Sequence, residues 1–170
     1  EVIANVALEI MGQEKGDYDT ISPLDHVNMS QSTNDTYPTA LLVGFLKEYD
    51  PLLKAVKSLS KAFYAKGREF ADVIKMGRTQ LQDAVPMTLG QEFCAFGDTL
   101  LLDIDRLNEM SELFLEINLG ATAIGTGVNS HPDYPKLAVE ALAELSGLPL
   151  VVDPHTIEAT SDTSAFVSFS

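Results

Sequence analysis

Two long stretches of apolar residues at helical spacing constrain the fold of this chain more than any other feature. In the longer stretch, apolar side chains stand three, four or seven positions apart: Phe93, Phe96, Leu100, Ile104, Leu107, Phe114 and Ile117. Such spacings place side chains on one face of an α-helix. We therefore expect a helix of about seven turns, which is longer than usual in globular proteins and typical of a long-helix bundle.

The other stretch carries its apolar residues on one helix face after a predicted break. These residues are Leu52, Val56, Leu59, Phe63 and Phe70. A helical pattern also runs from Thr39 to the Asp50–Pro51 pair. Because Asp is a common N-cap and Pro a common first helical residue, we expect one helix to end there and another to begin.

The remaining segments predict shorter elements around these helices. Helices are expected over residues 1–11, over Pro135–Ser146 with Gly147 past its end, and from near Ser161 onward. Residues 148–152 indicate a short extended segment. The predicted fold class is therefore mainly α, a long-helix bundle with polar loops and at most a short strand or hairpin.

Three polar clusters hold the candidate binding residues: Gln31–Asp35, Arg78–Asp83 and Gly120–Gly127. All are rich in uncharged hydrogen-bond donors, which suits a small anion. An N-cap with local turns explains one or two side chains of the first cluster, while the free amides of a helix N-terminus would also attract a carboxylate. The third cluster lacks the Lys-Ser/Thr ending of a Walker motif, so it favours an anion pocket or close packing over nucleotide binding.

Charge and residue counts disfavour several partners and cofactors. A net charge of −14 argues against nucleic acid and against an anionic membrane surface, and no apolar run approaches the roughly 18 residues of a membrane span. The three histidines lack any zinc-binding spacing, so no metal and no other cofactor is expected. The single cysteine, Cys94, lies on the apolar helix face, which favours a buried structural thiol. Because one cysteine cannot form a disulfide within the chain, we expect a reducing compartment such as the cytoplasm.

Both ends of the chain show helical apolar patterns without the usual boundary signals. Residues 1–12 have neither an initiator Met nor a cap, and residues 165–170 stop without a terminating signal. We therefore expect a piece of a larger protein, cut inside helices at both ends.

Three stretches resemble the aspartase/fumarase superfamily, in the order in which that family carries them. Residues 26–39 (HVNMSQSTNDTYPT) resemble its substrate loop, residues 75–92 its second signature region, and residues 118–129 (NLGATAIGTGVN) a third. The resemblance covers essentially the whole chain. It implies that residues 1–170 form part of the central helical domain of a larger enzyme, without that enzyme's N-terminal domain and C-terminal part.

Within the superfamily, the residues favour the aspartase branch. Class II fumarases usually carry Thr-His in the second region, where this chain has Thr79-Gln80, and residues 157–162 (IEATSD) also resemble aspartases. Ser30-Gln31 and His131-Pro132 resemble fumarases instead, so a class II fumarate hydratase stays the alternative. A non-catalytic helical assembly scaffold is a third hypothesis, against which the polar clusters argue.

The aspartase resemblance implies reversible elimination of ammonia from L-aspartate to give fumarate, through an aci-carboxylate that preplaced donors stabilise. It implies that Ser32, Thr33 and Asn34 contact the dicarboxylate substrate, and that Thr79 and Gln80 are added from another subunit. The general-base serine belongs to a loop expected beyond Ser170, so no catalytic residue is assigned within this chain, which alone is expected to lack lyase activity. The family also implies a homotetramer, so this chain is expected to self-associate through its apolar seams.

Overall fold

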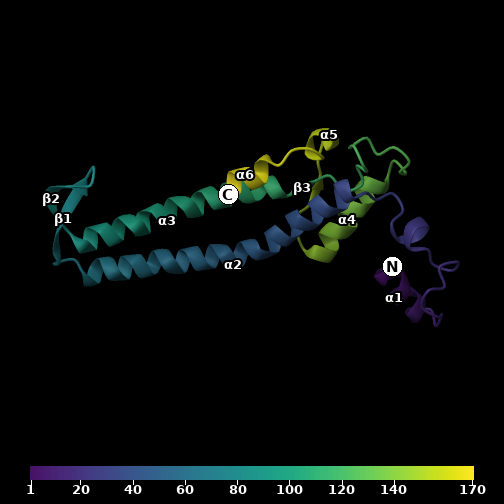
Figure 1. Cartoon of the computed structure of the whole chain (residues 1–170), viewed down its shortest axis with the longest axis horizontal. Helices are drawn as coiled ribbons and strands as arrows, with labels where there is room; N and C mark the ends of the chain where they lie inside the picture. The colour runs from purple at the N-terminus through teal and green to yellow at the C-terminus, as the bar shows by residue number, and fades with distance from the viewer. The chain divides into compact units, whose positions relative to one another are not determined.

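The computed structural model describes all residues from 1 to 170, and the chain divides into two compact units. We call Glu1–Val43 together with Leu115–Ser164 the loop unit, and Gly44–Phe114 together with Ala165–Ser170 the hairpin unit. Figure 1 labels the elements, which are mainly helices, as expected. None of the helices is both long and apolar enough to span a lipid bilayer.

The longest helix, α2, runs without interruption from Thr33 to Glu69. The predicted break at Asp50–Pro51 is therefore wrong, and so is the predicted start at Thr39. Proline removes one intrahelical hydrogen bond, but packing on both sides of it can hold the helix together. Before Pro51, the Phe45 ring stacks on Phe114 at 4.0 Å, and after it Phe63 contacts Phe96 at 5.6 Å between ring centroids.

The second long helix, α3, spans Leu89–Ser111 and begins with a capping box formed by Thr88 and Gln91. It ends earlier than its apolar spacing predicts, because the chain continues as a 3₁₀ turn over Glu112–Phe114 and then as strand β3, Glu116–Ile117. Phe114 and Ile117 are fully buried nonetheless. The apolar spacing therefore predicted the burial of these two residues correctly but their helical conformation wrongly. Ile117 lies in strand β3, which pairs in parallel with β4, Val151–Val152.

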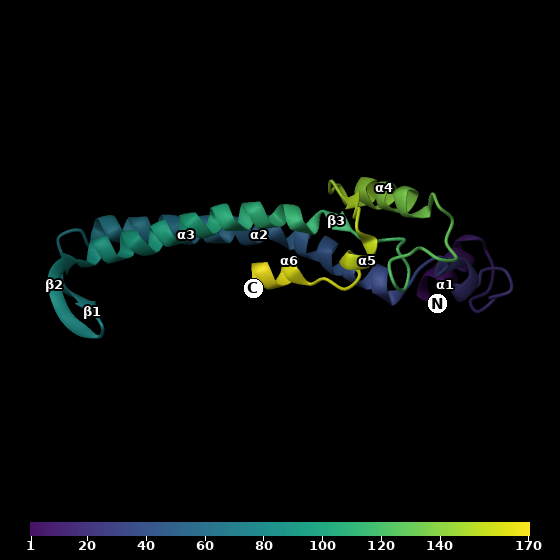
Figure 2. The same cartoon turned by 90° about the horizontal axis from the view of Figure 1, so that it is seen from above.

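In the hairpin unit, α2 and α3 lie side by side, as Figure 2 shows. Small residues line the contact: the Ser60 hydroxyl donates to the carbonyl of Gly97 at 3.1 Å, and Gly67 faces Cys94. The predicted apolar face is therefore only partly correct, because Leu52 and Leu59 are exposed while Ser60 and Gly67 are buried. An aromatic cluster fills the space beside them, consisting of Phe63, Phe70, Phe93 and Phe96.

An antiparallel hairpin joins the two long helices. Strand β1 spans Ile74–Thr79 and β2 spans Gln82–Thr88, with Gln80 and Leu81 as the two-residue turn. Both turn residues have positive φ, 50° and 63°, as the tight type I′ turn of a hairpin requires. The polar cluster Arg78–Asp83 is thus a hairpin tip, which the predicted fold class allowed.

The loop unit contains the shorter helices α1, α4 and α5 and the two small strands. Helix α1 spans Val2–Ile10, a π-helical turn follows over Pro23–Val27, and α4 spans Tyr134–Ser146 with Gly147 in the left-handed region past its end. The expected last helix is α6, Ser164–Phe169, whereas the short helix α5, Thr156–Ala159, was not predicted. The buried side chains of the loop unit include Ala4, Leu8, Ile117, Ala121, Val139 and Leu150.

Candidate functional site

The first polar cluster forms the N-terminus of α2. The backbone N–H of Asn34 donates to Ser32 Oγ at 3.2 Å, and the N–H of Ser32 donates to Asp35 Oδ1 at 2.9 Å. This pattern is a variant of the capping box, in which Asp35 stands at N3 in place of the usual Glu or Gln and the Ser32 hydroxyl accepts from N2 instead of N3. The N-cap interpretation of the cluster therefore holds for Ser32 and Asp35.

Asp35 does more than cap its own helix. Its side chain is 0% exposed, and its second oxygen, Oδ2, accepts the backbone N–H groups of Gly120 at 3.1 Å and Thr122 at 3.0 Å. Three N–H donors around one carboxylate stabilise its buried charge, because hydrogen bonds to an ionised acceptor are stronger than neutral ones. The sequence placed Asp35 in a polar cluster, but nothing in it indicated that its partners lie in the glycine-rich cluster.

Asn34 and Asn118 also link the N-terminus of α2 to the glycine-rich cluster and the residues next to it. The Asn34 amide donates to the carbonyl oxygen of Ala123 at 2.6 Å. Asn118, which is buried, donates from Nδ2 to the carbonyl oxygen of Asn34 at 3.0 Å and to Thr160 Oγ1 at 3.2 Å. One hydrogen of the Asn34 amide remains for another acceptor, since Nδ2 carries two.

The glycine-rich cluster turns sharply at several positions. Gly120, Gly125 and Gly127 all have positive φ, and so does the β-branched Thr122 at 64°. At Gly125 a side chain would also meet the backbone of Ile157, because a Cβ there would lie 2.5 Å from the Ile157 Cα. The Thr156 hydroxyl donates to the Gly125 carbonyl at 2.6 Å, which holds this end of the loop in place. These left-handed positions interrupt helical geometry, so the cluster forms a loop.

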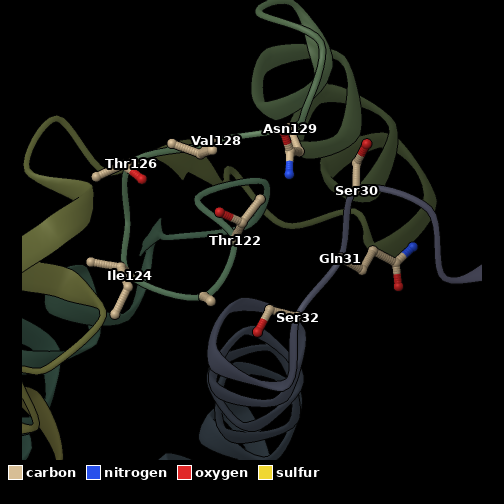
Figure 3. A pocket seen from close by; sticks show the side chains of 9 residues that line it. Ser30, Gln31, Ser32, Thr122, Ile124, Thr126, Val128 and Asn129 are labelled. Atoms are coloured by element: carbon tan, nitrogen blue, oxygen red, sulfur yellow. The ribbon is translucent and has the colours of Figure 1, made fainter.

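A cavity of about 570 Å³ opens between these two clusters within the loop unit. Figure 3 shows its lining side chains, with Ser30, Gln31 and Ser32 to the right, Thr122 near the centre, and Ile124 and Thr126 to the left. The lining contains no charged side chain: Ser30, Gln31, Ser32, Thr122, Ala123, Ile124, Thr126, Val128 and Asn129. Of the predicted substrate residues in this cluster, Ser32 lines the cavity, whereas Thr33 and Asn34 are exposed on the first turn beside it.

The predicted residues Thr79 and Gln80 lie in the other unit. Thr79 ends β1 and Gln80 begins the hairpin turn, and both are exposed. The charged neighbours of this tip are paired with each other, since Arg78 Nε contacts Asp83 Oδ1 at 3.1 Å. The structure thus gathers Ser32, Thr33 and Asn34 in one unit and leaves Thr79 and Gln80 outside the cavity lining.

Outside this cavity, we find no second group of reactive side chains that would form a binding or catalytic site. No His, Cys, Asp and Glu side chains gather in threes to hold a metal ion. Cys94 is half-buried on α3 opposite Gly67, rather than fully buried. A hydrogen bond to the Asp98 carboxylate, with some burial and the Asp98 charge, raises the pKa of Tyr64 above its ordinary value of 10.0. That pair belongs to the contact between α2 and α3 in the hairpin unit.

Comparison with known proteins gives consistent results over the full chain. The family model Lyase_1, described as lyase, matches residues 1–170. An aspartate ammonia-lyase of Pseudomonas aeruginosa is 62% identical over 171 residues, which cover 100% of this chain and 36% of that relative. This chain therefore spans about a third of the length of that curated relative.

Two solved structures share the fold. A fumarate lyase:delta crystallin from Brucella melitensis bound to cobalt superimposes with a TM-score of 0.91 and 55% identity, over 99% of this chain and 36% of that one. A class II fumarase from Schistosoma mansoni superimposes with a TM-score of 0.82 and 29% identity, over 99% of this chain and 38% of that one.

Proposed function

The chain belongs to the lyase family Lyase_1, and on that premise we propose that it is part of an aspartate ammonia-lyase, which converts L-aspartate reversibly to fumarate and ammonia. The observation that carries the proposal is the uncharged, donor-rich cavity at the N-terminus of α2. The 62% identity to the Pseudomonas aeruginosa aspartate ammonia-lyase supports the same reaction. In this proposal, residues 1–170 correspond to part of the central helical domain of the larger enzyme.

The chemistry explains why such a cavity is useful. A base removes a proton from Cβ of aspartate, and the electron pair of the broken C–H bond moves into the adjacent carboxylate. The resulting aci-carboxylate returns this pair to form the Cα–Cβ double bond, while the C–N bond breaks and ammonia leaves. Preplaced hydrogen-bond donors lower the energy of the intermediate because they stabilise the added negative charge.

We assign substrate binding to Ser32, Thr33 and Asn34. The Ser32 side chain lines the cavity, and Asn34 keeps one amide hydrogen free for a ligand. The positive end of the long α2 dipole lies at these residues and favours a carboxylate. We assign no residue of this chain to the proton abstraction itself.

Thr79 and Gln80 complete the proposed site from a neighbouring subunit. Both are exposed on the hairpin tip, where they are accessible to another molecule. Gln80 is uncharged at neutral pH and would orient the substrate by hydrogen bonding, without carrying a proton. The proposed assembly is a homotetramer in the cytoplasm. Apolar side chains exposed on the helices of the hairpin unit, Leu52, Leu59, Phe96, Leu101 and Leu102, support self-association.

A class II fumarate hydratase is the second candidate. The observation that favours it is the structural match to the Schistosoma mansoni class II fumarase, at a TM-score of 0.82. Its lower sequence identity, 29% against 62% for the ammonia-lyase, places it second.

A chimera tests the proposal directly. In this chimera, residues 1–170 replace the matching segment of the Pseudomonas aeruginosa aspartate ammonia-lyase, and fumarate formation is followed by its ultraviolet absorbance. We expect fumarate from L-aspartate and none above background from L-malate. Fumarate from L-malate alone would favour the hydratase, and a folded chimera that is inactive on both would contradict the proposal.

A substitution within the chimera tests the assigned site. Removal of the Ser32 hydroxyl in Ser32→Ala is expected to lower kcat/KM by about 10- to 100-fold, because one donor at the cavity is lost. The matched control is Ser58→Ala, which removes an exposed hydroxyl of the same helix in the other unit. Equal kinetics of the two variants would remove Ser32 from the site.

A further inference from the structure

We propose that Asp35 is a positioning residue, which fixes the width of the cavity by holding the glycine-rich loop against the N-terminus of α2. The inference rests on the proposed function only in taking the ligand to be a dicarboxylate. Asp35 itself is fully buried and does not line the cavity, so it acts through the residues that do.

The geometry joins the two walls through one carboxylate. Oδ1 accepts the N–H of Ser32, and Oδ2 accepts the N–H of Thr122. Ser32 and Thr122 are both lining residues, and they come from the two different segments that form the cavity (Figure 3). A change in the length or charge of the Asp35 side chain therefore moves one wall relative to the other.

The loop needs such a restraint because its conformation is unfavourable by itself. Thr122 has a φ of 64°, a region that β-branched residues rarely occupy. Residues in that region persist only where surrounding contacts hold them there. Two N–H groups of this turn, those of Gly120 and Thr122, donate to the same oxygen of Asp35, which supplies the restraint.

Only a carboxylate meets this requirement. An asparagine at position 35 would place an NH₂ group against at least one of the three N–H donors, leaving that donor unpaired. A glutamate keeps both acceptor oxygens but moves them outward by one methylene group. The expected order of function is therefore Asp35, then Asp35→Glu, then Asp35→Asn and Asp35→Ala.

Electrostatics gives the opposite expectation, which makes the test decisive. Asp35→Asn removes a negative charge close to the proposed binding site of a dicarboxylate with net negative charge, which by Coulomb's law alone should improve binding. If Asp35 positions the wall, the same substitution raises KM and lowers kcat, because small misplacements of binding groups cost about 100-fold in rate.

The experiment measures kcat and KM for L-aspartate in the chimera with Asp35→Asn, Asp35→Glu and, as a charge-matched control, Asp19→Asn, an exposed acid of the same unit. We expect kcat/KM to fall by about 100-fold in Asp35→Asn, to recover partly in Asp35→Glu and to stay unchanged in Asp19→Asn. Kinetics of Asp35→Asn equal to those of Asp19→Asn, or a lower KM, would overturn the inference.

A second measurement does not depend on activity or on the fold of the asparagine variant. In the 170-residue chain, amide hydrogen exchange of Gly120 and Thr122 is followed in the unsubstituted protein and in Asp35→Glu and Asp19→Asn. Faster exchange at both amides in Asp35→Glu alone supports the restraint, and unchanged exchange there refutes it. An inactive unsubstituted chimera would count against the proposed function and leave this measurement intact.

Discussion

Gly90 of α3 faces the carbonyl oxygen of Gly67 in α2 so closely that a methyl group at position 90 would overlap it. Such a methyl group would also lie 2.8 Å from the Cα of Ala71. These are backbone atoms, which cannot move aside as the end of a flexible side chain can. The absence of a side chain at Gly90 is therefore a requirement of the helix contact.

Replacement of this glycine gives the first prediction. Gly90→Ala is expected to destabilise the protein by about 1–3 kcal/mol, because overpacking displaces the two helices. The control is Gly44→Ala in α2, where a Cβ meets nothing within 4 Å. It should stabilise by up to about 1 kcal/mol through helix propensity. Urea unfolding measures both, and the same sign for the two variants would contradict the prediction.

The hairpin turn gives the second prediction. Leu81 is 98% exposed and has a φ of 63°, which costs a leucine about 1–2 kcal/mol. Leu81→Gly is therefore expected to stabilise the hairpin by about 0.5–1 kcal/mol. Val85→Gly, at an exposed position within strand β2, is the matched control and should destabilise instead. A loss of stability in Leu81→Gly, measured by urea unfolding, would show that its side chain has a structural role.

The buried Asn118 gives the third prediction. Asn118→Ala removes two hydrogen bonds, to the Asn34 carbonyl and to Thr160, and leaves the partly buried Asn34 carbonyl oxygen without this donor. We expect a loss of about 1–3 kcal/mol in the free energy of unfolding. Asn108→Ala is the control, because Asn108 is exposed and its side chain accepts one hydrogen bond, from Tyr49. Equal losses in the two variants would argue against a special role for the buried amide.

The pH dependence gives the fourth prediction. Because the Asp98 carboxylate raises the pKa of Tyr64, the folded state favours the neutral phenol. The stability contributed by the neutral phenol is therefore complete below the ordinary pKa of 10.0. It is lost as the pH rises through the higher pKa that Tyr64 has in the folded protein. Asp98→Asn should lower the pKa of Tyr64, which alkaline titration of tyrosinate absorbance detects when Tyr64→Phe serves as the reference. An unchanged pKa in Asp98→Asn would show that the hydrogen bond has no influence.

The features that could be predicted best from the sequence are those set by residues adjacent in the chain. The N-cap at the first polar cluster and helix α4 ending at Gly147 both follow from local chemistry. The break at Pro51 was predicted wrongly because local signals do not include the rings that pack on both sides of it. The early end of α3 was missed for the same reason, since the pairing of β3 with β4 joins residues far apart in the chain.

In the candidate site, too, local features could be predicted from the sequence, whereas contacts between distant segments could not. Ser32 belongs to a cluster that its polar residues marked as a candidate binding site, and it lines the cavity. The cavity itself depends on the Asp35 contacts to Gly120 and Thr122, which lie 85 and 87 positions away. No pattern within either cluster specifies that contact.

The division of the loop unit into two distant segments also has a consequence for the order of folding. The hairpin unit is largely continuous, from Gly44 to Phe114, whereas Glu1–Val43 must await Leu115–Ser164 before the loop unit can close. Contacts across long sequence separations form late because closing the intervening chain costs entropy. During synthesis we therefore expect the α2–α3 hairpin to form first. The side chain of Asp35 would then spend that interval in water, with its three N–H partners not yet assembled around it.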